Sequence, residues 1–161
     1  MSSFNRRHAL LSLAALAGCG FEPLYGRTGQ AEALRGRIAF QAPQTVEGFR
    51  LRARLEDRLG RTERGAYLLR VEMEIEEIAL VISSDQDINR FNLPGTARWQ
   101  LTADEDDAVL ASGVAETFTA YSAFGTTVAT RESQDDARDR LAIALADLII
   151  TDLIIAAGDL P

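Results

Sequence analysis

The chain has 161 residues and a net charge of −7 at neutral pH, and a chain of this length forms one domain with a sizeable hydrophobic core. The acidic balance argues against broad nucleic-acid binding, which needs a basic surface. The single histidine is His8 and the single cysteine is Cys19, so the rest of the chain offers no Ser–His–Asp or Cys–His nucleophile pair and no His/Cys zinc site.

The first residues have the form of an export signal. A positive start that includes Arg6 and Arg7 is followed by residues 9–17, of which only Ser12 is polar. An apolar run of this length is typical of a secretory signal and is too short to span a membrane as a mature helix. We therefore predict that residues 1–18 are removed, by a general or a twin-arginine export route.

The signal ends in Leu16-Ala17-Gly18-Cys19, which resembles the box of bacterial lipoproteins. In that family the cysteine thiol receives a diacylglyceryl group, the peptide is cut before the cysteine, and the new amino group is acylated. A thiolate is the nucleophile that this alkylation needs, and two or more acyl chains anchor a protein stably. The resemblance implies a covalent lipid on Cys19 and no other cofactor. The alternative is a cysteine buried as a small hydrophobe.

Residues 19–35 follow as the predicted lipidated N-terminus and tether, because they carry Gly, Pro, Thr and Gln. Residues 36–42 alternate apolar and polar side chains and predict a short strand. Thr45 is a plausible N-cap of a helix that runs to about Leu59, and Gly60 closes this helix.

This helix carries two stripes of side chains. One stripe is apolar and consists of Leu51, Leu55 and Leu59. Arginine suits bidentate contacts to phosphate or carboxylate, so a positive stripe beside it is a candidate contact for an anionic glycolipid. The alternative is a water-facing helix side that neighbouring acids neutralise in part. The positive stripe consists of Arg50, Arg54, Arg58 and Arg61.

Residues 67–83 form the clearest predicted strand, because apolar and charged residues alternate along its first half. At Glu76 and Glu77 the alternation changes phase, so that Ile78 and Leu80 become the apolar positions. A bulge or bend at this point would keep the apolar side chains facing the core.

Two further strands are predicted. Residues 91–101 carry apolar side chains at odd positions, and Pro94 indicates an edge or a bulge near the start. Residues 108–122 return after a charged turn, with Val114 and Phe118 expected to face inward. Short connections between sequential strands favour a meander.

Neither acidic stretch of the chain predicts a metal site. Residues 85–89 match the opening of a calcium loop, but Arg90 stands where that loop needs Gly and Thr96 where it needs Glu. The acids at 104–107 are typical of a solvated turn.

A long helix is predicted from Ser133, which begins a capping-box pattern, to Ala157. Its second half is apolar on more than one side, so we expect it to be buried on both sides by its own protein or by a partner. Asp147 and Asp152 interrupt the apolar run, and the helix is therefore no membrane span.

The element order is β-α-β-β-β-α. It predicts a single α+β domain over residues 36–161, with an antiparallel-dominated four-stranded sheet and two helices packed on one face.

The whole mature chain resembles the lipopolysaccharide-assembly lipoproteins (LptE) in their alphaproteobacterial form. The sharpest element of the resemblance is the sequence CGFEPLYG at residues 19–26, and a last helix of the type Ala-Arg-Asp-Arg-Leu-Ala adds to it. The resemblance implies a non-enzymatic outer-membrane lipoprotein on the periplasmic side, which assists assembly of an LptD-like β-barrel and plugs it. Lipopolysaccharide is then a candidate ligand, and Cys19 is the lipid site.

Two other functions stay open at this point. One is a lipid-anchored auxiliary subunit of a lipid-transporting ABC system, which would share the anchor and differ in its partner. The other is a hydrolase of envelope glycans that works with carboxylates alone, and it predicts a cleft with two carboxylates about 5–10 Å apart.

Overall fold

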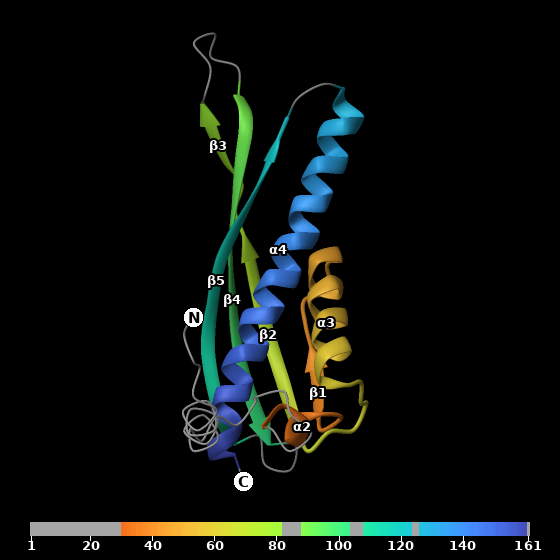
Figure 1. Cartoon of the computed structure of the whole chain (residues 1–161), viewed down its shortest axis with the longest axis vertical. Coiled ribbons are helices and arrows are strands. Elements are labelled where there is room, and N and C mark those ends of the chain that lie inside the picture. Colours follow the sequence, from red (N-terminus) through yellow and green to blue (C-terminus); the bar gives the residue numbers. More distant parts are fainter. Residues whose placement is uncertain (1–29, 82–87, 104–107, 124–125, 161) are drawn as a thin grey trace, which may run out of the picture.

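The computed structural model describes residues 30–81, 88–103, 108–123 and 126–160 (Figure 1). Within these ranges the protein is an α+β domain with a five-stranded sheet. Its two long helices lie together on one face of the sheet (Figure 1). The strands are β1 (Ile38–Gln41), β2 (Tyr67–Ile75), β3 (Ile78–Val81), β4 (Ile88–Ala103) and β5 (Val109–Ser122). The helices are α2 (Gln30–Leu34), α3 (Val46–Leu59), α4 (Thr127–Ala156) and the short 3-10 helix η1 (Ala157–Asp159).

The sheet is mostly antiparallel, as predicted. Strand β4 is its centre, with β5 along one edge and β2 and β3 in succession along the other. Strand β1 adds a parallel pair at the far side of β2. The expected four strands become five because the strand predicted over residues 67–83 is divided into β2 and β3.

The division between β2 and β3 lies opposite Pro94 of β4. Ile75 pairs with Gly95 and Ile78 pairs with Asn92, so the register is the same on both sides of the break. The Glu76 N–H still donates to the Pro94 carbonyl at 3.0 Å, but proline has no N–H to return the bond. The hydrogen-bond ladder between β4 and the β2–β3 segment is therefore interrupted here, although neither side contains an inserted residue.

This unbroken register makes the predicted change of phase wrong. In a strand, successive side chains point to opposite faces, so odd-numbered residues keep facing the helices beyond Glu76. Ile78 and Leu80 consequently lie on the other face and are exposed. The register shifts only between Leu80 and Val81, after both residues, and so does not turn them back toward the core.

The prediction for β5 is wrong in the same way. Phe118 pairs with Pro94, and Tyr121 pairs with Phe91, so the odd-numbered residues of β5 face the helices. Val114 and Phe118 lie on the opposite face and are exposed. The inward side of β5 carries Ala115 and Tyr121, which are buried in the core, together with Gly113, Thr117 and Thr119, and α4 packs against this strand.

Helix α3 forms as the sequence predicts. Thr45 caps it, since the Thr45 hydroxyl accepts a hydrogen bond from the Gly48 N–H at 3.0 Å. The apolar stripe of Leu51, Leu55 and Leu59 is fully buried. Gly60 follows with a φ of 83°, a left-handed conformation that glycine adopts at little cost.

Helix α4 is longer than predicted. It begins at Thr127 with Thr126 as the N-cap, whereas the Ser133 hydroxyl donates to the Ala129 carbonyl inside the helix. The second half is buried against both the sheet and α3, and nine of its residues from Ala137 to Ile154 are inaccessible to solvent. In the described part of the chain, no helix is long and apolar enough to cross a membrane.

Candidate functional site

The predicted lipid site, Cys19, lies outside the residues that the structure describes. The acidic residues 104–107 and most of the stretch 85–89 also lie outside them. Among the described residues, no three His, Cys, Asp or Glu side chains are grouped so that they could hold a metal ion.

The first half of the arginine stripe joins α3 to α4. The Arg54 guanidinium makes two hydrogen bonds to the Asp147 carboxylate, from Nε to Oδ1 at 2.8 Å and from Nη2 to Oδ2 at 3.1 Å. The hydrogen bond to Asp147 raises the pKa of Arg54 despite an opposing effect of burial. Arg50 reaches Asp139 at 3.0 Å. These two arginines therefore hold the helices together, and each already has a carboxylate partner.

The second half of the stripe lies closer to solvent. Arg61 approaches Glu56 at 3.9 Å, a long ion pair, and 70% of its side chain is exposed. Arg58 is exposed and also has a partner within the protein. The contact of this stripe with an anionic glycolipid stays a prediction, and Arg61 is its most accessible member with a described ion pair.

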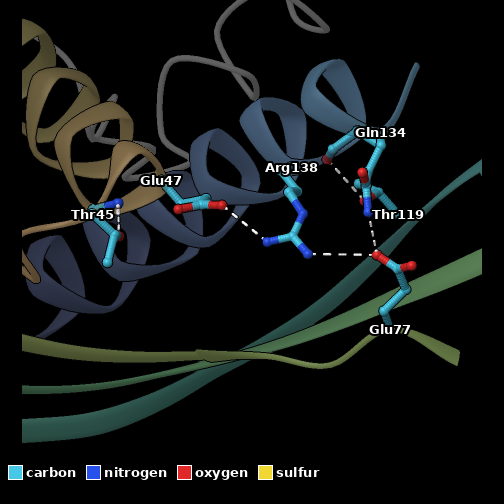
Figure 2. A network of polar contacts seen from close by, with 8 residues as sticks. Thr45, Glu47, Glu77, Thr119, Gln134 and Arg138 are labelled. Carbon is cyan, nitrogen blue, oxygen red and sulfur yellow. Dashed lines mark hydrogen bonds and ion pairs between the residues drawn. The ribbon is translucent and has the colours of Figure 1, made fainter. Parts of the chain in front are cut away.

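A polar network that sequence reasoning missed is centred on Arg138 of α4 (Figure 2). Arg138 Nη1 donates to Glu47 of α3 at 3.1 Å, and Nη2 donates to Glu77, between β2 and β3, at 3.5 Å. One guanidinium thus connects α3, α4 and the break in the sheet. The only signal in the sequence was a charged residue on a helix expected to be buried.

Glu77 receives further donors from both sides. Gln134 of α4 donates to Glu77 Oε2 at 2.6 Å, and the Tyr121 hydroxyl donates to Oε1 at 3.1 Å. Nearby, the Thr119 hydroxyl donates to the Ala137 carbonyl at 2.9 Å (Figure 2). Glu77 is therefore satisfied by its own protein, and the network fastens α4 to the sheet.

The electrostatic effects in this network are those of partly buried groups. Hydrogen bonding to its own backbone N–H lowers the pKa of Glu47 and outweighs the opposing effect of burial, and Arg138 adds to the lowering. Burial raises the pKa of Tyr121 to about 12, and the hydrogen bond to Glu77 contributes to the increase. These shifts keep Glu47 ionised and Tyr121 protonated at neutral pH, as their hydrogen bonds require.

The sheet face opposite the helices holds an open depression of about 380 Å³. Its lining includes Arg70, Arg98 and Gln100, and among the described residues that line it only Glu72 has a carboxylate. A carboxylate-dependent hydrolase needs two such groups flanking the scissile bond. This depression therefore gives no support to the glycan-hydrolase hypothesis.

The same face carries exposed apolar side chains from two strands, β3 and β5. Large hydrophobic residues usually face the core, and here they point away from the two long helices. Pro94 of β4 is half-buried beside them. The exposed apolar residues of this face are Ile78, Leu80, Val114 and Phe118.

No protein-family model matches the sequence, and no curated protein matches it. Solved structures do match it. A candidate lipoprotein from Caulobacter crescentus CB15 is 25% identical with a TM-score of 0.67, and the match covers 83% of this chain and 98% of that one.

Two other structures share the fold at lower identity. The rare lipoprotein B from Shewanella oneidensis is 14% identical with a TM-score of 0.59, over 76% of this chain and 95% of that one. A minor lipoprotein from Acinetobacter baumannii is 19% identical with a TM-score of 0.55, over 78% of this chain and 94% of that one. The α+β fold of this chain is therefore the fold of proteins described as bacterial lipoproteins.

Proposed function

We propose that this protein is a lipid-anchored subunit of the lipopolysaccharide translocon at the periplasmic side of the outer membrane. It assists assembly of an LptD-like β-barrel and plugs the barrel for lipopolysaccharide insertion. It acts by binding and not as an enzyme, and its only prosthetic group is the lipid on Cys19.

The observation that carries this proposal is the box Leu16-Ala17-Gly18-Cys19 directly after an export signal and directly before the Gly20–Gly26 sequence. Gly20 in place of an aspartate fits the general rule for sorting to the outer membrane. The fold supports the proposal, because the structural neighbours named above are described as lipoproteins. A body fastened by ion pairs between its helices suits a plug that must keep its shape.

The decisive experiment is co-purification from detergent-solubilised outer membrane. We expect the tagged protein to retain an LptD-like barrel in a stable complex, and its depletion to reduce the folded barrel and the lipopolysaccharide at the cell surface. Insertion of a normal amount of folded barrel after depletion would contradict the proposal.

The same purification distinguishes the proposed function from its main alternative. An auxiliary subunit of a lipid-transporting ABC system would be recovered with an ATPase from the inner-membrane fraction. Recovery of the barrel without an ATPase supports the translocon, and recovery of the ATPase alone overturns it.

A further inference from the structure

We propose that the open edge of β5 binds an extended, basic peptide segment of a protein partner as an additional strand. The segment lies between this edge and the second half of α4, which runs alongside β5 (Figure 1). We define the edge groove by residues 112–118 of β5 together with Leu148, Asp152 and Ile155 of α4. The inference goes beyond the proposed function and does not depend on it.

Strand β5 ends the sheet on one side. It pairs with β4, and no other strand of the described ranges pairs with it. Edge strands are usually short, or protected by charged side chains and proline. Strand β5 has 14 residues, contains no Lys, Arg or Pro, and has Glu116 as its only charged residue. An edge of this kind is a template on which an extended peptide can pair.

Pro94 of β4 shows which backbone groups of β5 point out of the sheet. Its carbonyl accepts a hydrogen bond from the Glu76 N–H at 3.0 Å, and so it points away from β5. Residues opposite each other in an antiparallel pair exchange either both hydrogen bonds or none. Phe118, which pairs with Pro94, therefore turns its N–H and carbonyl to the open edge. Since the register continues without a shift, Glu116 and Val114 do the same.

Helix α4 supplies the second wall of the edge groove. Leu148, Asp152 and Ile155 follow one another at intervals of four and three residues, and they lie on one side of the helix. Leu148 and Ile155 are exposed. Asp152 and Ile155 line an open cavity of about 340 Å³ together with residues 111–113 of β5. A strand added to β5 would therefore pack alternate side chains against this part of α4.

The same cavity contains a buried donor that has no acceptor. Trp99 lines the cavity and is only 5% exposed, and its Nε1 has no hydrogen-bond partner among the described residues. Buried donors normally have an acceptor. An oxygen atom of a bound segment would supply one. Trp99 is therefore an indication of a ligand that is independent of the open edge.

Charge in the edge groove favours a basic segment. Asp152 is the only charged residue among those that line the cavity, and it has no ion pair or hydrogen bond within the described part of the chain. The nearest basic residue along α4 is Arg140, about 18 Å away by the rise of a helix. On the other side of the sheet, Arg98 lies one strand further in and approaches Glu74 at 3.8 Å. Asp152 and Glu116 are thus the charges next to the added strand.

The same residues argue against a second copy of this chain as the occupant. A second copy would add its own β5, which has no Lys or Arg and brings another Glu116. Like charges along a shared edge oppose association. A lipid or a sugar lacks the alternating N–H and carbonyl groups that match a strand edge. The occupant that fits is an extended protein segment with Lys or Arg side chains.

A synthetic probe tests strand addition directly. The probe is a peptide of about nine residues, within the ordinary range of strand lengths, in which Val alternates with Thr and Lys. Trp99 is the single tryptophan, so its indole N–H signal in NMR reports binding to the full chain in detergent. We expect a saturable shift of this signal. N-methylation of one alternate set of peptide residues should raise the Kd at least about tenfold, and methylation of the other set should change it less than about twofold.

Variants of the chain separate the backbone from the side chain. Val114→Pro removes an N–H that points out of the sheet, so the fold should persist, while the Kd of the probe rises at least about tenfold. Val114→Ala keeps this N–H and is the matched control. Asp152→Asn should raise the Kd about threefold, whereas Asp135→Asn, about 25 Å away along α4, should leave it unchanged. Circular dichroism checks the folding of each variant, and the methylated probes decide the question if Val114→Pro unfolds.

Three outcomes would overturn the inference. One is no saturable shift at Trp99, or equal binding of both methylated probes, which excludes strand addition. Another is equal binding of a probe with Glu in place of Lys, which excludes a basic occupant. The third is a dimer in sedimentation that Val114→Pro converts to monomers, which makes a second copy the occupant. None of these measurements involves recovery of the barrel, so the inference and the proposed function stand or fail separately.

Discussion

Tyr121 is the residue whose acid–base behaviour the fold alters most visibly. Burial and the hydrogen bond to Glu77 raise its pKa to about 12 from the ordinary tyrosine value of 10.0. Titration followed by tyrosinate absorbance should therefore show a late step near pH 12, which Tyr121→Phe removes. Loss of a step near pH 10 in that variant, with no late step in the wild type, would contradict the structure.

The raised pKa of Tyr121 also makes the free energy of unfolding depend on pH. Because the folded pKa of Tyr121 lies above the unfolded value, its contribution is fully present below about pH 10. That contribution is lost as the pH rises through about 12. The free energy of unfolding of the wild type should therefore fall toward that of Tyr121→Phe across this alkaline range.

Gly113 packs directly against the Trp99 ring, which leaves no room for a side chain. A Cβ at this position would come within 2.8 Å of the Trp99 indole ring, which is buried against β5. We expect Gly113→Ala to lower the free energy of unfolding by about 1–3 kcal/mol, the usual range for overpacking. Urea unfolding measures this change, and Trp99, the single tryptophan, reports it through a shift in fluorescence emission.

Ser112→Ala is the matched control for that substitution. Ser112 is the neighbouring residue on the exposed side of β5, so its loss should change the free energy of unfolding by less than about 0.5 kcal/mol. Equal effects at the two positions would show that β5 does not pack on Trp99 as described.

At the scale of elements, Arg138 connects α3, α4 and the sheet. Its Nη1–Glu47 distance is 3.1 Å and its Nη2–Glu77 distance is 3.5 Å. With about one third of the Arg138 side chain exposed, we expect a coupling free energy of about 1 kcal/mol with Glu47, and less with Glu77. Double-mutant cycles with Arg138→Met, Glu47→Gln and Glu77→Gln measure both couplings.

The Glu47 arm of the network also has a pH dependence. Because the pKa of Glu47 is lowered from 4.5, its contribution is present above that value and is lost as the pH falls through the folded pKa. The difference in free energy of unfolding between the wild type and Glu47→Gln should therefore shrink toward zero in acid. A difference that stays constant down to pH 2 would contradict this assignment.

Local elements could be predicted from the sequence where local chemistry decides them. Thr45, the leucine stripe of α3 and Gly60 define that helix by capping, periodicity and a left-handed turn, and the structure has all three. The alternation in residues 67–75 likewise predicted β2. Each of these signals involves residues close together in the chain.

The orientation of β5 could not be predicted in that way. Which side of a strand faces inward depends on its register with β4 and on how closely α4 approaches. Apolar residues alone favoured Val114 and Phe118 as inward, because a strand normally turns its large apolar residues to the core. Their exposure follows from pairs such as Phe118 with Pro94, which no local sequence pattern reveals.

At the scale of the whole molecule, the fold class followed from element order, but the functional surfaces did not. The sequence predicted one continuous stripe of arginines on α3. In the structure, Asp139 and Asp147 of α4 form ion pairs with Arg50 and Arg54, so only the second half of the stripe lies away from α4. The exposed apolar residues Ile78, Leu80, Val114 and Phe118, in contrast, lie on one sheet face because β3 and β5 both pair with β4. Surfaces of this kind depend on tertiary contacts.

The lipid anchor and contacts with a protein partner make separable contributions to where the molecule lies. Each buried CH₂ of an acyl chain contributes about 0.8 kcal/mol, so a multiply acylated Cys19 would hold the protein at a membrane without any protein contact. Cys19→Ala should therefore appear in the periplasmic fraction or accumulate as an uncut precursor at the inner membrane. Fractionation followed by immunoblotting measures both outcomes, and Thr28→Ala, outside the box, should leave the wild-type distribution unchanged. If Cys19→Ala stays in the outer membrane, contact with a protein partner and not the lipid retains the protein there.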